Sequence, residues 1–116
     1  MLTVITEFRR GIFFVRLKGV LNTKTREVLN KKVTSLVKEY GITNLVINVE
    51  DLKKIDLEGI SEVFNNYLYI RKYSGTSFLC GLNNNIEKDI KKSHILNYVP
   101  LINNELNAMK VIKWIG

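Results

Sequence analysis

The chain has 116 residues, of which 46% are hydrophobic and 25% are charged, and its formal net charge is +7. This length predicts a single domain over residues 1–116. One cysteine, Cys80, excludes an internal disulfide and fits a reducing cytosol. No apolar run approaches the length that spans a membrane. Residues 1–5 lack the basic leader of a signal peptide, so we expect a cytoplasmic protein.

The surplus of basic residues raises the question of nucleic-acid binding. These residues form short, dispersed pairs such as Arg9-Arg10 and Lys53-Lys54, and neither a zinc-finger spacing nor an aromatic RNA-binding stripe accompanies them. We therefore interpret the charge as a solvated basic surface. An acidic protein partner ranks next, and nucleic acid ranks last.

The first part of the chain predicts a hairpin followed by a helix. Residues 2–8 and 12–21 have the alternating pattern of two strands joined by a tight turn. The following helix is predicted to begin near Asn22-Thr23, whose side chains suit a cap, and to run to Tyr40. Gly41 directly after it is typical of a left-handed helix end.

The second part repeats the alternation of strand and helix. Thr43–Val49 is an almost continuous apolar run, which predicts a strand covered on both faces. The later predicted elements are a helix from Asp56 towards Tyr73, a strand over 76–82, a short helix over 86–93 and an edge-like strand over 98–102. Asn103 or Asn104 is predicted to cap a last helix that runs through Ala108 to Trp114. The order ββαβαβαβα indicates an α/β fold with a mostly parallel or mixed sheet and right-handed crossovers.

The most informative segment is Asp51–Ile60, which follows the apolar strand and opens the second long helix. Asp56 stands where a helix N-cap is expected, because its carboxylate can accept hydrogen bonds from the first unpaired backbone N–H groups. Gly59 allows another backbone or a partner to come close. The segment therefore predicts a tight junction between a strand and a helix.

The run Asp56-Leu57-Glu58-Gly59 resembles the signature turn of the STAS family, which usually reads Asp-Ser-Ser-Gly. The resemblance covers essentially the whole chain. Ile12–Asn22 resembles the second strand of the family with its Gly-x-Leu-Asp end, and Leu45–Asp51 resembles the strand before the signature. It is closest to small single-domain members such as the sporulation anti-anti-sigma factor. The resemblance implies a STAS-like mixed sheet of four to five strands with helices packed on one side.

The resemblance also implies a non-catalytic regulatory module of bacteria, of the anti-sigma-factor-antagonist type. In that family a partner kinase phosphorylates the second serine, and the unphosphorylated antagonist binds a kinase-like anti-sigma factor and frees the sigma factor. On this chain the implied partner-binding residues are Asp56, Leu57, Glu58, Gly59, Asn22 and Thr23. The alternative is a scaffold subunit of a signalling assembly that binds another STAS protein or itself.

Position 58, where the family carries the phosphorylated serine, holds Glu58, which cannot be phosphorylated and is already negative. In the first turn of a helix the dipole favours such a charge by about 0.3–1 kcal/mol. A phosphoserine carries about −1.5 to −2 charges and three strong acceptor oxygens. Glu58 thus imitates a phosphate in sign and location, but not in strength or shape. Three interpretations stay open: a good helix residue, a constitutively phosphorylated-like surface, or a surface redirected to another partner.

Three neighbouring positions matter as well. Leu57 replaces the first serine with an apolar side chain that is either buried or an interface anchor. Asn22 stands where the family often has aspartate, and it keeps the capping oxygen but loses the charge. Ser61, one turn beyond Leu57, is either a displaced phosphorylation site or an ordinary serine of the helix surface.

The sequence contains no residue set that supports a reaction. We find neither a phosphate-binding glycine loop nor a catalytic triad, and therefore expect neither an enzyme nor a cofactor. His94, the only histidine, has no cysteine or carboxylate pair at ligand spacing, so we expect no metal site.

Overall fold

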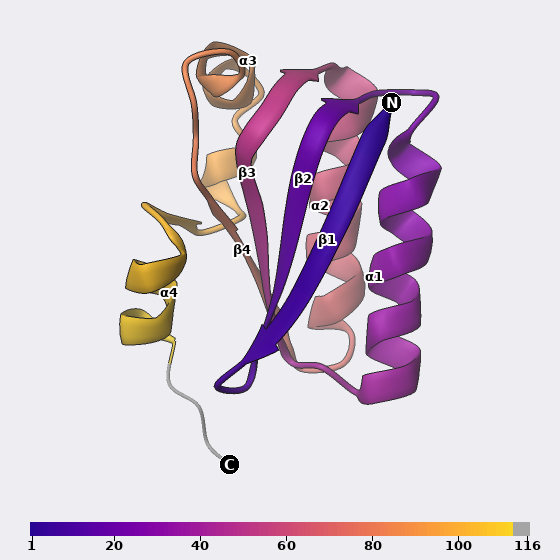
Figure 1. Ribbon diagram of the computed structural model, residues 1–116, viewed down its shortest axis with the longest axis vertical. Helices are drawn as coiled ribbons and strands as arrows, with labels where there is room; N and C mark the ends of the chain where they lie inside the picture. Colours follow the sequence, from indigo (N-terminus) through magenta and orange to yellow (C-terminus); the bar gives the residue numbers. More distant parts are fainter. Residues whose placement is uncertain (113–116) are drawn as a thin grey trace.

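The computed structural model describes residues 1–112, and Figure 1 shows how its helices and strands are arranged. In chain order the elements are β1 Leu2–Arg9, β2 Ile12–Leu21, α1 Arg26–Tyr40, β3 Asn44–Ile55, α2 Leu57–Arg71, β4 Thr76–Cys80, α3 Glu87–Lys92, the 3-10 helix η1 Ile95–Asn97, β5 Leu101–Ile102 and α4 Glu105–Val111. The predicted order ββαβαβαβα is confirmed. The short helix η1 is the element that the sequence pattern did not predict.

The sheet has five strands in the order β1-β2-β3-β4-β5, with β1 antiparallel to β2 and all other neighbours parallel. The β1–β2 hairpin closes through Arg10 and Gly11, with φ of 51° and 77°, the left-handed pair that suits a two-residue turn. Helices α1 and α2 lie on the same side of the sheet (Figure 1), as right-handed crossovers between neighbouring parallel strands require. The carboxyl ends of β2, β3 and β4 therefore meet at one edge of the sheet.

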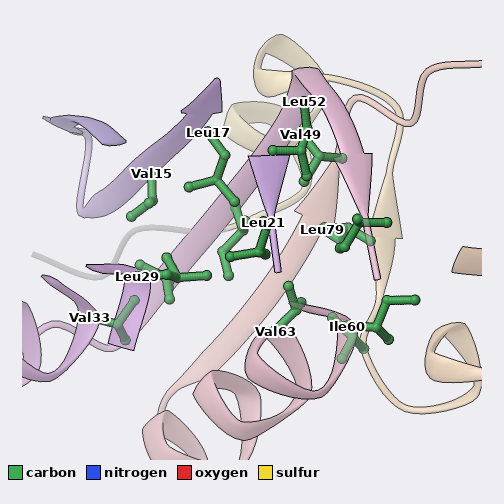
Figure 2. Close-up of a cluster of buried hydrophobic side chains, with 14 of the residues drawn as sticks. Val15, Leu17, Leu21, Leu29, Val33, Val49, Leu52, Ile60, Val63 and Leu79 are labelled. Carbon is green, nitrogen blue, oxygen red and sulfur yellow. The ribbon is translucent and has the colours of Figure 1, made fainter. Parts of the chain in front are cut away.

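The main core lies between the sheet and helices α1 and α2 (Figure 2). Its side chains come from one face of strands β2, β3 and β4 and from the inner faces of both helices. They include Val15, Leu17, Leu21, Leu29, Val33, Val49, Leu52, Ile60, Val63 and Leu79. Full burial of one such side chain stabilises the fold by about 1.5–3 kcal/mol, so this cluster is what holds α1 and α2 against the sheet.

Helix α4 covers the opposite face of the sheet. The fold class is confirmed, but the expectation of helices on one side holds for the two long helices α1 and α2 and not for α4. The cluster beneath α4 comprises Ile12, Phe14, Val46, Cys80, Ala108 and Ile112. This second cluster exists because the central strands are apolar on both faces. Burial raises the pKa of the Cys80 thiol to about 12, and the side chain packs here as a small buried hydrophobe.

A network of charged side chains fastens α4 to the sheet. Arg16 on β2 donates two hydrogen bonds of 2.8 Å to the carboxylate of Glu105, at the start of α4, and a third of 2.8 Å to Glu7. The amide of Asn48 donates to Glu105 Oε2 at 2.7 Å. The Arg16 guanidinium holds the pKa of Glu105 below its usual range, and the two carboxylates raise the pKa of Arg16.

We expect this network to make the protein less stable in acid. A carboxyl group whose pKa is lowered by folding stabilises the fold above its unfolded pKa, about 4.3 for glutamate, and loses that contribution as the pH falls through the folded pKa. Urea unfolding at a series of pH values from about 6 down to about 2.5 measures the loss. Glu105→Gln should show a smaller loss than the wild type, and identical pH profiles would contradict the role given to this carboxylate.

Strand β3 ends at Ile55, whereas the sequence predicted an end at Val49. The extra residues continue the parallel ladder with β2, and Leu52 and Ile55 remain buried. The exposed Lys53 and Lys54 interrupt the apolar pattern, which is why the extension was missed. This longer strand carries the signature turn directly at its end.

The C-terminal third also differs in detail from the prediction. The strand expected over 98–102 is reduced to β5, because the N–H groups of Tyr98 and Val99 donate to the carbonyl of Ile95 in η1 instead of to a strand. Helix α4 is capped as predicted by Asn104, whose Oδ1 accepts a hydrogen bond from the N–H of Asn107 at 2.8 Å. It runs through Ala108 as predicted, and the predicted end at Trp114 lies outside the described residues. Within residues 1–112 no helix combines the length and the apolarity that crossing a membrane requires.

Candidate functional site

The N-terminus of α2 is built by Asp56 and Gly59 as the sequence predicted. Asp56 is the N-cap, and its Oδ1 accepts a hydrogen bond of 2.8 Å from the N–H of Gly59. The N–H of Asp56 donates to the carbonyl of Leu21 at 3.3 Å, which ties the turn to the end of β2. A Cβ on Gly59 would lie 2.3 Å from that same carbonyl oxygen, so the close approach is to the chain's own backbone.

Asn22 and Thr23 lie in a turn before α1 rather than in the helix itself. The predicted start is wrong by several residues, because α1 begins at Arg26. The side-chain oxygen of Asn22 accepts from the N–H groups of Lys24 and Thr25 at 2.9 and 3.1 Å, which closes a turn on its own. Asn22 thus keeps a local capping role, while Thr23 is exposed at the tip of the turn.

Glu58 is engaged by a residue that sequence reasoning did not single out. Arg26, the first residue of α1, forms an ion pair through Nη1 with Oε2 of Glu58. The same guanidinium donates from Nε to Oε1 of Glu62, one helical turn further along α2, at 3.3 Å. Asn30 Nδ2 donates to the other oxygen of Glu62 at 3.1 Å. The first turns of α1 and α2 are therefore joined by charged and polar side chains.

Leu57 is 74% exposed and separates two hollows in the surface. One hollow, of about 480 Å³, lies towards α3 and includes Asp89 and Lys92 in its lining. The other, of about 280 Å³, lies towards η1 and is largely apolar, with Phe64 and Tyr98 meeting edge to face at 5.5 Å between ring centroids. Of the two alternatives for Leu57, burial is thus excluded within this chain, and an interface anchor remains.

A third hollow, of about 430 Å³, brings Asn22 and Asp56 to one surface although they are far apart in the sequence. Lys53, Lys54 and Asn85 line it as well. The turns after β2 and β3 and the loop after β4 therefore form one continuous face at the carboxyl edge of the sheet. The predicted site residues gather on this face because parallel strands end together.

Three polar side chains of this face already form hydrogen bonds or ion pairs within the protein. Asp56 caps α2, the Asn22 side chain closes its turn, and Glu58 pairs with Arg26. Within residues 1–112 no group of three or more histidine, cysteine, aspartate or glutamate side chains is placed to hold a metal ion. The arrangement presents an apolar side chain among hollows, which suits binding of a protein.

Comparison with known proteins places this geometry in a family. The model of the STAS domain matches residues 3–108. This chain belongs to the STAS domain family. Among curated STAS relatives, the anti-sigma F factor antagonist of Paenibacillus polymyxa is 23% identical over 108 residues, which cover 93% of this chain and 92% of the relative.

Solved structures show the same STAS fold. An anti-sigma factor antagonist from Mycobacterium paratuberculosis matches with a TM-score of 0.86 and 17% identity, over 97% of this chain and 94% of that chain. A glutamate-for-serine variant of RsbS from Moorella thermoacetica matches with a TM-score of 0.78 and 11% identity, over 92% of each chain. The predicted STAS fold is confirmed.

The STAS signature turn was predicted from its residues, but the side chains that support it were not. The sequence pattern did not single out Arg26, Glu62 and Asn30. The partners Arg26 and Glu58, like Asn30 and Glu62, are 32 residues apart in the sequence, and no local pattern marks a pair at that distance. The spacing of Glu58 and Glu62 could have predicted the contact. Residues four apart place two carboxylates on one face of a helix, where their repulsion favours a cation that pairs with both. Tyr98 carried no such signal, because η1 was not predicted.

Proposed function

We propose that this STAS protein is a non-catalytic docking module of the anti-sigma factor antagonist type. Its contact surface centres on Asp56, Leu57, Glu58 and Gly59, with Asn22 and Thr23 beside it. The observation that supports this most directly is the exposed Leu57 between two hollows at the head of α2. An apolar side chain of this kind stabilises an interface when a partner buries it.

The partner in this proposal is an anti-sigma factor, including one of the kinase-like type. The Paenibacillus polymyxa relative supports it, since that protein carries the name of an antagonist of anti-sigma F factor and matches over nearly its full length. Because Glu58 cannot accept a phosphate, docking is not switched by phosphorylation at this position. The expected compartment is the cytoplasm.

A scaffold role is the second candidate. Leu57 replaces a hydrated hydroxyl by a large apolar group, which suits an interface that is occupied permanently, by another STAS protein or by a second copy. Nucleic-acid binding through the basic surface ranks below both, and it predicts an affinity that falls steeply as salt rises.

Affinity capture from a lysate of the source organism tests the proposal with wild type, Leu57→Ser and Glu58→Ser side by side. We expect the wild type to retain an anti-sigma factor and Leu57→Ser to bind it at least about tenfold more weakly, because burying a leucine contributes about 1.5–3 kcal/mol and 1.4 kcal/mol corresponds to a factor of ten. Glu58→Ser should regain an acceptor that a kinase-type partner phosphorylates with ATP.

Leu106→Ser is the matched control, since Leu106 is 59% exposed but lies on α4, on the other face of the sheet. It should bind like the wild type. Retention of the same STAS protein by wild type, Leu57→Ser and Glu58→Ser would favour the scaffold role. If neither the wild type nor Glu58→Ser retains any anti-sigma factor, the proposed function is wrong.

A further inference from the structure

We propose that Arg26 withdraws the charge of Glu58 from the docking surface, so that a partner meets the apolar Leu57 without a free anion beside it. The inference rests on the proposed function and concerns how the same site is regulated. With Glu58 paired in this way, the protein resembles an unphosphorylated antagonist rather than a permanently phosphorylated one. Arg26 is the positioning residue that makes the difference.

The geometry places one guanidinium against two carboxylates on successive turns of α2. Nη1 of Arg26 pairs with Glu58, and Nε donates to Glu62 at 3.3 Å. The side chain of Glu58 is 52% exposed and that of Arg26 is 27% exposed, whereas Glu62 is only 4% exposed. The Glu58 carboxylate is therefore directed towards Arg26 on α1, while about half of its side chain remains exposed to solvent.

The buried Glu62 explains why Arg26 is held ready for this contact. A carboxylate removed from water needs a cation and further hydrogen bonds, which Arg26 and Asn30 provide. Arg26 is therefore fixed by Glu62 whether or not position 58 is charged. An ordinary surface ion pair must order two long side chains and gains little. Here only Glu58 has to be ordered, because the guanidinium is already in place.

The charges of these three side chains show what the pairing achieves. The formal charges of Arg26 and Glu62 sum to zero. Glu58 brings this sum to −1, and its carboxylate lies directly against the Arg26 guanidinium. A phosphoserine in the same place would leave about −1.5 to −2, more than one guanidinium can balance. Docking against Leu57 must strip water from its neighbours, and a free carboxylate there would oppose binding. Arg26 lowers that obstacle, because the carboxylate of Glu58 is paired rather than free.

The contact itself can be tested without any partner. The cycle uses a Glu62→Gln chain, in which the amide oxygen at position 62 can still accept the hydrogen bond from Arg26 Nε, while loss of Arg26 leaves no unpaired carboxylate there. In this chain the unfolding equilibria of Arg26→Gln, Glu58→Gln and the combination form a double-mutant cycle. We expect a coupling of about twofold to fivefold in the unfolding constant, the range of an exposed ion pair, and its reduction in 1 M NaCl. Strict additivity in low salt would overturn the assignment of Arg26.

The second readout is the affinity for the anti-sigma factor recovered in the capture experiment. The effect of Glu58→Gln on this affinity is measured in the Glu62→Gln chain, once with Arg26 present and once with Arg26→Gln. We expect Glu58→Gln to strengthen binding about tenfold more in the chain that lacks Arg26. Equal effects in both backgrounds would mean that Glu58 acts on the partner as a free charge, which overturns the proposal. Glu27→Gln, an exposed acid of the first turn of α1, serves as the control for charge alone.

The two arms separate the possible failures. If the cycle shows coupling but no anti-sigma factor binds, the proposed function is wrong and the compensation of Glu58 by Arg26 stands. If the factor binds but Glu58 and Arg26 act independently, the function stands and the present inference is wrong.

Discussion

Replacement of Gly59 by alanine is expected to destabilise the protein by about 2–3 kcal/mol, although alanine favours helices. In a free helix the change would stabilise by about 1 kcal/mol. Here the new Cβ would lie 2.3 Å from the oxygen and 2.9 Å from the carbon of the Leu21 carbonyl. The Leu21 carbonyl belongs to the backbone and cannot rotate away. The overpacking cost therefore lies at or above the upper end of the usual range of about 1–3 kcal/mol, and it outweighs the gain in helix propensity. Urea unfolding measures the change.

The same substitution should separate α2 from the end of β2. The hydrogen bond from Asp56 to Leu21 is expected to open, and faster amide exchange at Asp56 would report it. Gly41→Ala is the matched control, because no atom lies within 4 Å of its added Cβ and only its φ of 59° is unfavourable. That variant should lose about 1–2 kcal/mol and leave Asp56 protected. A Gly59→Ala protein as stable as the wild type would contradict the close packing described here.

Removal of the Arg26 side chain is expected to cost about 3 kcal/mol of stability. The reason is Glu62, whose side chain is 4% exposed and would keep only the hydrogen bond from Asn30. Breaking a buried pair by deleting one partner typically costs about 3–5 kcal/mol. We place Arg26→Ala at the lower end of that range, because the guanidinium is partly exposed and Asn30 remains. Chemical denaturation of the purified variant gives the value.

A second substitution identifies the cause of that loss. In the Arg26→Ala chain, Glu62→Gln removes the stranded charge and should restore about half of the lost stability, while Glu58→Gln should restore little because Glu58 reaches solvent. If Glu58→Gln rescues as well as Glu62→Gln, the buried carboxylate is not what depends on Arg26.

Local patterns predicted the elements that local chemistry controls. The hairpin turn at Arg10 and Gly11, the cap at Asp56 and the stop at Gly41 each depend on residues within one or two turns of each other, and each was found as predicted. Errors arose where distant contacts override the pattern. The extension of β3 to Ile55 follows from its pairing with the end of β2, which no window along the sequence contains.

From the amino-acid sequence alone it follows that this chain is a STAS domain, that Asp56 caps the helix of the signature turn, and that position 58 carries a charge that no kinase can add or remove. Three further facts required the packed fold: Leu57 is exposed, Gly59 faces the backbone of Leu21, and Glu58 is held by Arg26. The physical reason is the range of the interactions. Caps and turns act between neighbouring residues, whereas exposure and charge compensation depend on which helix packs beside which, and that is settled by the core beneath them.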